Sequence, residues 1–458
     1  MNARSRCRSL TILLFLGSLL VPASGLAAQA RNIILMIGDG MGPSQFGAAW
    51  LYSTRVLGRE LRMVDLMKNG RTAYLVNDGA DAVLTESAAA ATQIACGVKV
   101  PARVVGMGPD GKTPCKTVLV LAKEKGMATG LVTTSGITDA TPAAFVAHVK
   151  DRGDEATVAV QELQARVDVL LGGRRQFFLP ESAGGNRKDG WDLRAGACQA
   201  GYGIVESAAE LERASGGKIL GLFSMGNMAF EIDRAKTDEP SLAQMTAKTL
   251  EVLAANPKGF FAMIEGGRID HAAHRNDAAA TIRDTLAFDE AVGVVLDFQQ
   301  KHPDTLVIVT ADHETGGMAL IGHGRDSKEY AGINLAAIQK AQASFEVIVD
   351  EFGKNPTSEN VRNVVKKYLA IEITEDEARI VANDTLRKLD PWNFSNPTLH
   401  SLAFVLRPYL GVGWSSQAHT ASPLFAFGLG PGSEGLVGFR HNTELFQIMK
   451  SALPINPE

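Results

Sequence analysis

The chain contains 458 residues, of which 45% are hydrophobic and 21% are charged, and its formal net charge is −4 at pH 7. This acidic balance argues against a nucleic-acid partner, because proteins that bind nucleic acids present basic surfaces to the phosphates. The length alone allows two or three domains, although large α/β enzymes of this size often fold around one sheet.

The first 28 residues have the layout of a secretory signal peptide. Three arginines precede an apolar run over residues 10–21, and small residues follow up to Ala30. The run is too short for a comfortable membrane span, and no later apolar stretch is long enough to cross a bilayer. We therefore expect a periplasmic or secreted protein of net charge −7, with a signal peptide of about residues 1–28, cleaved after Ala27, Ala28 or Ala30, and a main domain over residues 29–458.

Three cysteines remain after this segment: Cys96, Cys115 and Cys198. In an oxidising compartment they can form at most one disulfide, which leaves one thiol over. The sequence leaves the pairing open.

Seven apolar segments are predicted to be β-strands, and several are continuous runs typical of parallel strands covered on both faces. They span residues 32–37, 72–76, 128–134, 167–171, 260–264, 306–310 and 424–428. Helical patterns lie between them, and the helix expected over residues 277–301 has an apolar face made by Ile282, Leu286, Val292, Val295 and Leu296. This alternation predicts an α/β fold with a mostly parallel central sheet and helices on both faces.

Residues 324–411 depart from the alternation. They contain no convincing strand but three helix-like segments, at 333–352, 358–370 and 374–389. Thr374 and Glu377 have the spacing of a capping box. We expect a helical insertion or cap beside the sheet rather than a separate catalytic domain.

Acidic residues and a histidine follow several of the predicted strands: Asp39, Glu265, Asp312 and His313. A single acid at a strand end is usually a helix cap or a turn residue. Ligands of open α/β sheets bind outside the carboxyl ends of the strands, however, so these side chains can converge. Asp312 and His313 are adjacent and can reach one metal only if their strand has already ended.

Three more residues extend this candidate metal site. Asp270 and His274 are four residues apart and share one face if the segment is helical. A carboxylate and an imidazole on one face suit zinc. His419, shortly before the last predicted strand, can complete the set. Any one of these histidines alone is more often structural than a ligand, but together they favour a metal site.

The stretch at residues 84–97 carries four alanines directly after Ser87, which favours a helix that begins near this serine. The free N–H groups and the positive end of the helix dipole would favour an anion there. The hydroxyl can be a nucleophile toward phosphorus if a neighbour removes its proton. Most serines in such a position are ordinary helix caps, and it is the other motifs that favour the nucleophile.

With these motifs in place, the chain resembles the alkaline phosphatases, a family of metal-dependent phosphomonoesterases. Six motifs in family order, spanning roughly residues 32–438, carry the resemblance: Gly38-Asp39-Gly40-Met41-Gly42, Glu86-Ser87-Ala88-Ala89, Asp139-Ala140-Thr141-Pro142-Ala143-Ala144, Glu265-Gly266-Gly267-Arg268-Ile269-Asp270-His271, Thr310-Ala311-Asp312-His313-Glu314 and Ala418-His419-Thr420. The resemblance implies that the protein hydrolyses small phosphate monoesters to an alcohol and inorganic phosphate. It also implies the fold of that family and a homodimer.

The same resemblance implies a role for each site residue. Ser87 would become a phosphoserine and Arg152 would bind the phosphate. One zinc would be held by Asp270, His274 and His419, and a second by Asp39, Asp312 and His313. One magnesium would be held by Asp39, Thr141 and Glu265, with Asp139 in its outer shell. The chemistry of these donors agrees, because carboxylates with imidazoles suit zinc and an all-oxygen set suits magnesium.

Two positions depart from the usual pattern of the family. Glu86 stands where an Asp commonly helps to hold the arginine, and His271 is combined with Asp139, although the two are usual in different branches. A phosphodiesterase or a sulfatase of the same superfamily would share the zinc pair, but Arg152 and the magnesium set favour monoesters. A secreted binding protein without turnover would not need the serine at the helix start.

Overall fold

The computed structural model describes residues 29–322, 332–383 and 397–454. The signal segment expected over residues 1–28 therefore lies outside the described residues. Among the helices that are described, none is both long enough and apolar enough to cross a membrane.

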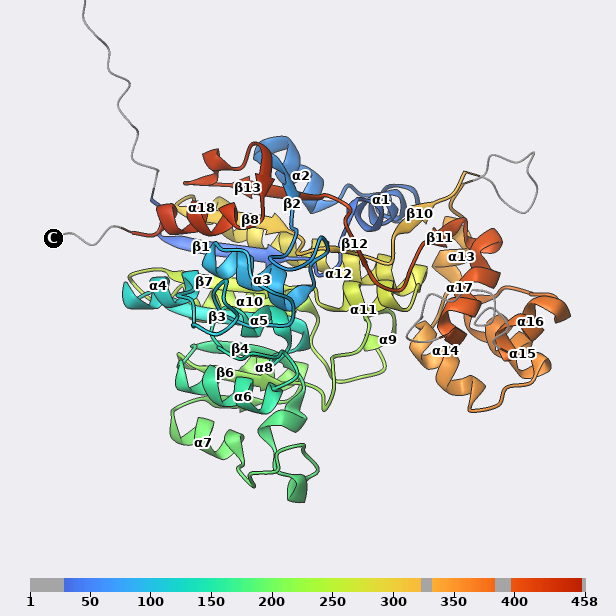
Figure 1. Ribbon diagram of the computed structural model, residues 1–458, viewed down its shortest axis with the longest axis horizontal. Helices are drawn as coiled ribbons and strands as arrows, with labels where there is room; N and C mark the ends of the chain where they lie inside the picture. The colour runs from blue at the N-terminus through green and yellow to red at the C-terminus, as the bar shows by residue number, and fades with distance from the viewer. Residues whose placement is uncertain (1–28, 323–331, 384–396, 455–458) are drawn as a thin grey trace, which may run out of the picture.

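The fold is built on a ten-stranded sheet with the order β14-β2-β13-β8-β1-β7-β3-β4-β6-β5 (Figure 1). β13 is antiparallel to β2 and β8, whereas every other neighbouring pair in this sheet is parallel. The strands are β1 (Asn32–Ile37), β2 (Arg71–Val76), β3 (Ala128–Gly136), β4 (Val169–Gly173), β5 (Gly203–Val205), β6 (Ile219–Leu222), β7 (Phe260–Glu265), β8 (Thr305–Thr310), β13 (Leu424–Leu429) and β14 (Gly438–His441). The mostly parallel sheet predicted from the sequence is confirmed.

All seven predicted strands are present, and three more complete the sheet. β5, β6 and β14 have only three or four residues each, too few to show a periodic pattern in the sequence. Each of them lies toward an end of the strand order, whereas the long predicted strands form most of its middle.

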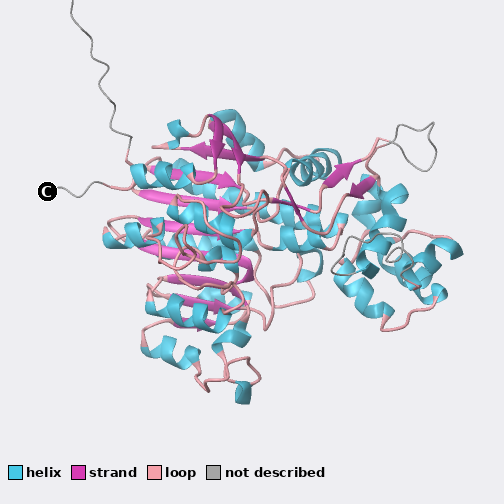
Figure 2. Ribbon diagram, in the orientation of Figure 1, coloured by secondary structure: helices cyan, strands magenta, loops and turns pink. Residues whose placement is uncertain are grey.

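Helices cover both faces of the central strands (Figure 2). Every residue of β1, β7 and β8 is buried. Since successive side chains of a strand point to opposite faces, complete burial requires cover on both sides. One group of contacting helices contains α1 (Pro43–Tyr52), α2 (Arg62–Asn69), α10 (Leu242–Leu253) and α12 (Ala278–Lys301), and another contains α3 (Ser87–Cys96), α4 (Val118–Glu124), α5 (Ala140–Ala143) and α18 (Glu444–Ala452).

A set of helices follows β10 (Met318–Leu320) and returns to the sheet through β11 (Val412–Trp414), its antiparallel partner. It lies on the right of Figure 1 and comprises α13 (Leu335–Lys340), α14 (Phe345–Phe352), α15 (Ser358–Leu369), α16 (Glu375–Ala382) and α17 (Pro397–Leu410). The capping box of Thr374 and Glu377 is present at the start of α16. The predicted continuation of that helix to residue 389 falls largely outside the described residues.

The single helix predicted over residues 333–352 is wrong, because the structure has two helices there. Ser344 caps α14 by accepting a hydrogen bond from the backbone N–H of Val347. The N–H groups of Ser344 and Phe345 donate to Asp233 (3.2 Å) and Asp277 (2.6 Å). These partners from outside the segment satisfy the start of a second helix, which the local apolar pattern does not reveal.

The structure shows which of the three cysteines form a disulfide. Cys96, the last residue of α3, is bonded to Cys115, and Cys198 is free and exposed.

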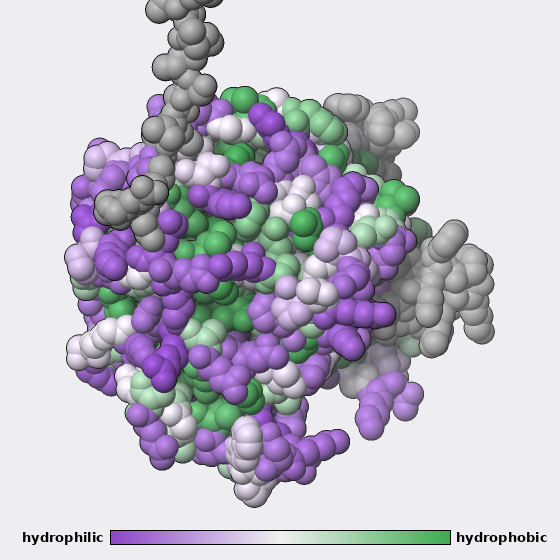
Figure 3. Space-filling model, turned by 60° about the vertical axis from the view of Figure 1, so that its left-hand side comes forward, coloured by the Kyte–Doolittle hydropathy of each residue, from purple (hydrophilic) through white to green (hydrophobic). Residues whose placement is uncertain are grey.

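On the face that Figure 3 shows, small groups of apolar residues lie between hydrophilic ones. A scattered distribution of this kind is usual for the surface of a globular protein.

Candidate active site

The candidate site lies at the carboxyl ends of four neighbouring strands, β8, β1, β7 and β3. Asp39 follows β1, Glu265 ends β7, Asp312 follows β8 and Asp139 follows β3, and all four side chains are buried. Because these strands are parallel, their carboxyl ends meet at one edge, and the sheet order brings the four acids together.

Asp312 and His313 face the same site because β8 ends at Thr310, before either residue. Nε2 of His313 lies 3.3 Å from Oδ2 of Asp312 and 3.5 Å from Oδ1 of Asp39. The turn after β1 is held to this group by the N–H of Gly40, which donates to Oδ1 of Asp312 (3.1 Å). Gly40 has a φ of 70°, and a Cβ there would lie 2.8 Å from Cα of Asp270, so the turn requires glycine.

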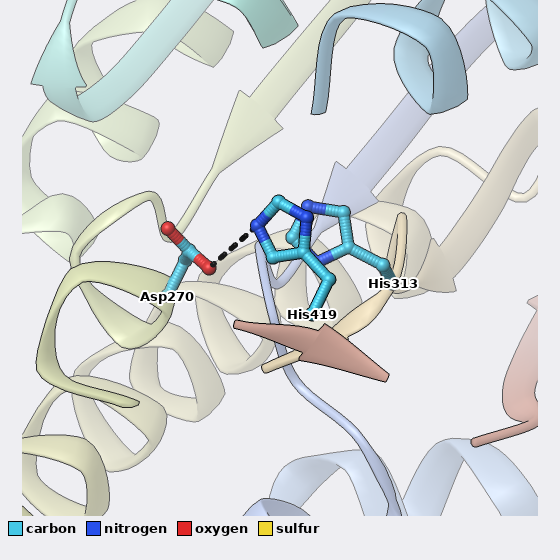
Figure 4. Close-up of side chains that lie close together, drawn as sticks. All are labelled: Asp270, His313 and His419. Carbon is cyan, nitrogen blue, oxygen red and sulfur yellow. Dashed lines mark ion pairs between the residues drawn. The ribbon is translucent and has the colours of Figure 1, made fainter. Parts of the chain in front are cut away.

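His419 reaches the site through a short pairing of strands. β12 (His419–Thr420) is antiparallel to β9 (Glu314–Thr315), with His419 opposite Thr315. Its ring stacks on that of His313 with the centroids 3.8 Å apart, and Asp270 faces it from the other side (Figure 4). The pairing thus places a residue from near the end of the chain beside the ends of the central strands.

Asp270 and His274 lie on one face of α11 (Arg268–His274), where Nε2 of His274 is 3.3 Å from Oδ1 of Asp270. Nε2 of His274 is also 3.1 Å from Nε2 of His419. Two groups of side chains are therefore arranged so that each could hold a metal ion: Asp270, His313 and His419, and Asp39, Asp312 and His313. His274 adjoins the first of these groups.

Each of the three imidazoles is oriented by a partner at its other nitrogen. Nδ1 of His274 lies 2.5 Å from the carbonyl oxygen of Gln417, and Nδ1 of His419 lies 3.2 Å from that of Thr85. Nδ1 of His313 lies 3.2 Å from the hydroxyl of Thr315. This arrangement leaves each Nε2 directed into the cluster, as in histidines that bind metals.

The cluster holds buried oxygens that a cation could bind. Among the described residues, no hydrogen-bond partner exists for one oxygen in each of four buried side chains: Asp39, Thr141, Glu265 and Asp312. Burial raises the pKa of Asp312 to about 8 and that of Glu265 to about 7. Burial and the carboxylates around it also raise the pKa of Asp39 well above its usual range. Without added positive charge, these acids cannot all ionise together.

Ser87 is the first residue of α3, but it does not cap the helix. The cap is Glu86, whose carboxylate accepts hydrogen bonds from the N–H groups of Ala88 (3.1 Å) and Ala89 (2.9 Å). The buried hydroxyl of Ser87 lies 3.2 Å from Nε2 of His313. The ordinary capping role considered for Ser87 is therefore filled by its neighbour.

Arg152 is held between two carboxylates. Its Nη1 lies 2.6 Å from Oε2 of Glu86 and its Nη2 lies 3.0 Å from Oδ1 of Asp139. The backbone of Arg103 closes a ring, because its N–H donates to Oε1 of Glu86 (2.8 Å) and its carbonyl accepts from the N–H of Arg152 (2.9 Å). Arg103 has a φ of 69°, a conformation that few residues other than glycine adopt. The loop at Arg103 thus contacts both Glu86 and Arg152.

The ring of His271 contacts Arg268. Its Nδ1 lies 3.1 Å from Nη1 of Arg268, and burial, with Arg268 as a further cause, lowers the pKa of His271 to about 3. The cations that touch Asp139 are Arg152 and Arg174, the latter 3.0 Å from Oδ2. The unusual combination of Asp139 and His271 thus does not form a direct pair in the described structure.

Sequence reasoning missed two side chains of the site. Thr315 donates to Oδ1 of Asp270 (2.5 Å) and also touches His313, so it links the two ligand groups. Arg174 directly follows β4, and the rule that ligands gather at strand ends would have singled it out. No local pattern marked Thr315, whose contacts depend on the approach of α11.

Buried carboxylates and imidazoles thus gather at the carboxyl end of a mostly parallel sheet, beside a helix start and an arginine, and form a candidate metal-binding centre of the kind found in metal-dependent hydrolases. The family model "Alkaline phosphatase" matches residues 30–455. The chain belongs to the alkaline phosphatase family, whose members hydrolyse phosphomonoesters.

Relatives and solved structures agree with this assignment. "Alkaline phosphatase 4" of Bacillus subtilis is 33% identical, over 93% of this chain and 90% of the relative. The "Repressible alkaline phosphatase" of Saccharomyces cerevisiae is 32% identical, over 97% and 86%. The crystal structure of Thermus thermophilus alkaline phosphatase superimposes with a TM-score of 0.85 at 34% identity, covering 93% of this chain and 92% of that one.

Proposed function

We propose that the protein hydrolyses phosphate monoesters through a phosphoserine at Ser87, at a site that holds two zinc ions and one magnesium ion. The observation that carries this proposal is the placement of the Ser87 hydroxyl. It is buried at the start of α3, is not used as a helix cap, and touches a histidine of the candidate metal cluster.

The donor set fits the three ions. We assign one zinc to Asp270, His274 and His419 and the second to Asp39, Asp312 and His313. The magnesium is assigned to Asp39, Thr141 and Glu265, whose buried oxygens include three without a hydrogen-bond partner in the described residues. A structure of a His-to-Asp mutant of the alkaline phosphatase from the Antarctic bacterium TAB5, 25% identical with a TM-score of 0.67, has Mg bound in its M3 site, which supports a magnesium ion in this site as well.

In the proposed reaction, Ser87 and Arg152 have separate roles. Oγ of Ser87 attacks phosphorus as the alcohol leaves with a proton, and water afterwards cleaves the phosphoserine to release inorganic phosphate. When bound, the metal ions supply the positive charge that activates the attacking oxygens and stabilises the leaving ones. Arg152 has further N–H donors beyond those in its two ion pairs, and these bind phosphoryl oxygens. Its positive charge favours monoesters, because they carry more negative charge than diesters.

We place this enzyme in the periplasm or outside the cell. The N-terminal segment has the pattern of a secretory signal, and the bond between Cys96 and Cys115 is typical of an oxidising compartment.

Helices α13–α17 serve as an insertion beside the sheet. They are tied to the helix that carries Asp270 and His274 by Glu346, which pairs with Arg268 (3.1 Å) and Arg275 (3.3 Å).

Metal removal provides the first test. Because the proposed ions supply most of the charge that stabilises the phosphoryl group, chelation should abolish hydrolysis of p-nitrophenyl phosphate, and zinc with magnesium should restore it. The diester bis-p-nitrophenyl phosphate should be a much poorer substrate under the same conditions. Full activity of the exhaustively demetallated protein would overturn the mechanism, and equal turnover of the diester would overturn the substrate class.

The nucleophile and the arginine should fail in different ways. Ser87→Ala should abolish the covalent phosphoenzyme, which acid quenching and mass spectrometry detect in the parent. Arg152→Ala should still form phosphoserine but raise KM and the inhibition constant of inorganic phosphate about 10- to 100-fold, the loss of a charge-assisted hydrogen bond. A phosphoryl label on any residue other than Ser87 would contradict the assignment.

Glu86→Asp separates two roles of one carboxylate. Asp caps helices at least as well as Glu, so the melting temperature should stay close to that of the parent. The shorter side chain should fall short of Arg152, and we expect KM to rise about tenfold while Ser87 is still phosphorylated. If KM and kcat are both unchanged, Glu86 acts only on the helix end.

We also infer a homodimer, supported by an exposed aromatic surface made by Tyr74 of β2 and Phe439 of β14. Their rings stack 6.1 Å apart, and Phe439 is 69% exposed at the edge of the sheet. Sedimentation equilibrium should give the mass of two chains, and Phe439→Asp should give one. Trp191→Asp, at a similarly exposed aromatic (59%), is the control that should stay dimeric. A monomeric parent protein would refute the inference.

A further inference from the structure

Arg174 occupies a position that the reaction described above does not use. It directly follows β4, next to β3 in the sheet, so it lies beside the loop that carries Asp139. Its backbone has a φ of 61°, and its side chain crosses Gly136, where a Cβ would come within 2.1 Å of Cδ of Arg174. The side chain is only 17% exposed. The fold therefore makes room for this arginine and confines it.

The guanidinium of Arg174 contacts three separate segments. Nη2 lies 3.0 Å from Oδ2 of Asp139, and Nη1 lies 2.8 Å from Oε2 of Glu155, the first residue of α6 (Glu155–Gln164). Nε donates to Oδ1 of Asn227 (2.9 Å). Three acceptors around one planar group fix its orientation, which a lysine could not reproduce.

Asp139 is the link between the two arginines. Oδ1 accepts from the N–H of Ala140 (2.8 Å) and lies 3.0 Å from Nη2 of Arg152. Oδ2 accepts from the hydroxyl of Ser135 (2.6 Å) and lies 3.0 Å from Nη2 of Arg174. A carboxylate can accept about four hydrogen bonds, so the four contacts described here occupy all the acceptor sites of Asp139. Its charge is shared between the guanidinium groups of Arg152 and Arg174.

The structure assigns to Arg174 a positioning role: it holds Asp139 so that Arg152 is aimed at the phosphoryl group and remains free to bind it. Without Arg174, Asp139 would direct its charge to Arg152 alone and compete with the phosphate for the same donors. The site would also lose a buried positive charge close to a dianionic ligand. Both effects weaken phosphate binding, while the nucleophile and its surroundings stay in place.

This inference rests on the proposed role of Arg152 in binding phosphate, and the experiment separates the two. The affinity of the metal-loaded protein for inorganic phosphate is measured by calorimetry, together with KM and kcat for p-nitrophenyl phosphate. Arg174→Ala should raise the dissociation constant of phosphate and KM about tenfold, with a smaller change in kcat and with phosphoserine still formed. Arg174→Lys should lie between this variant and the parent.

Arg175→Ala is the matched control. Arg175 is the next residue, and it also forms an ion pair, but with Glu206 (2.5 Å) rather than with Asp139. It should leave the phosphate affinity unchanged. In the Asp139→Asn background, Arg174→Ala should add little, because two residues that act through one contact are not additive.

An unchanged phosphate affinity in Arg174→Ala would overturn the inference, as would an equal loss in Arg175→Ala. If Arg174→Ala does not fold, Arg174→Lys and Asn227→Ala carry the same test, and no change in either would overturn it. If Arg152→Ala also leaves the phosphate affinity unchanged, the proposed role of Arg152 fails instead.

Discussion

The crowding of buried carboxylates is the constraint on which the rest of the site depends. Asp39, Glu265, Asp270 and Asp312 meet at the ends of the central strands and the adjacent helix, in surroundings that disfavour charge. Burial opposes ionisation of Asp270 too, but His274, His419 and His313 lower its pKa. For Glu265 and Asp312, the hydrogen bonds that they accept offset only part of the effect of burial, and around Asp39 burial and the neighbouring carboxylates raise the pKa together. Cations bound among these acids, as proposed above, would stabilise their ionised forms.

A series of ion pairs begins beside Ser87. Glu86 caps α3 and also binds Arg152, so a single side chain links the helix start to the arginine. From there the contacts continue through Asp139 to Arg174 and Glu155. Negative and positive side chains alternate along this series of ion pairs. Each arginine lies between two carboxylates, and these contacts fix the orientation of its guanidinium group.

The helices between β10 and β11 are joined to the site by contacts at one end of α14. Asp233 and Asp277 accept hydrogen bonds from its first N–H groups, and Glu346 pairs with Arg268 and Arg275 at either end of α11. α11 carries Asp270 and His274. The position of α11 is therefore set both by its contacts with α12 and β9 and by the ion pairs with α14.

The sequence by itself determined the long central strands, the start of α3 at Ser87 and the acids at the strand ends, because local periodicity and motif spacing encode them. It could not determine that Cys96 pairs with Cys115, that Arg174 meets Asp139, or that Thr315 touches Asp270. Nor did it reveal that α14 begins as a separate helix, since its first N–H groups are satisfied by Asp233 and Asp277. Such contacts join segments far apart in the chain, and only the order of the strands and the packing of the helices decide which of them become neighbours.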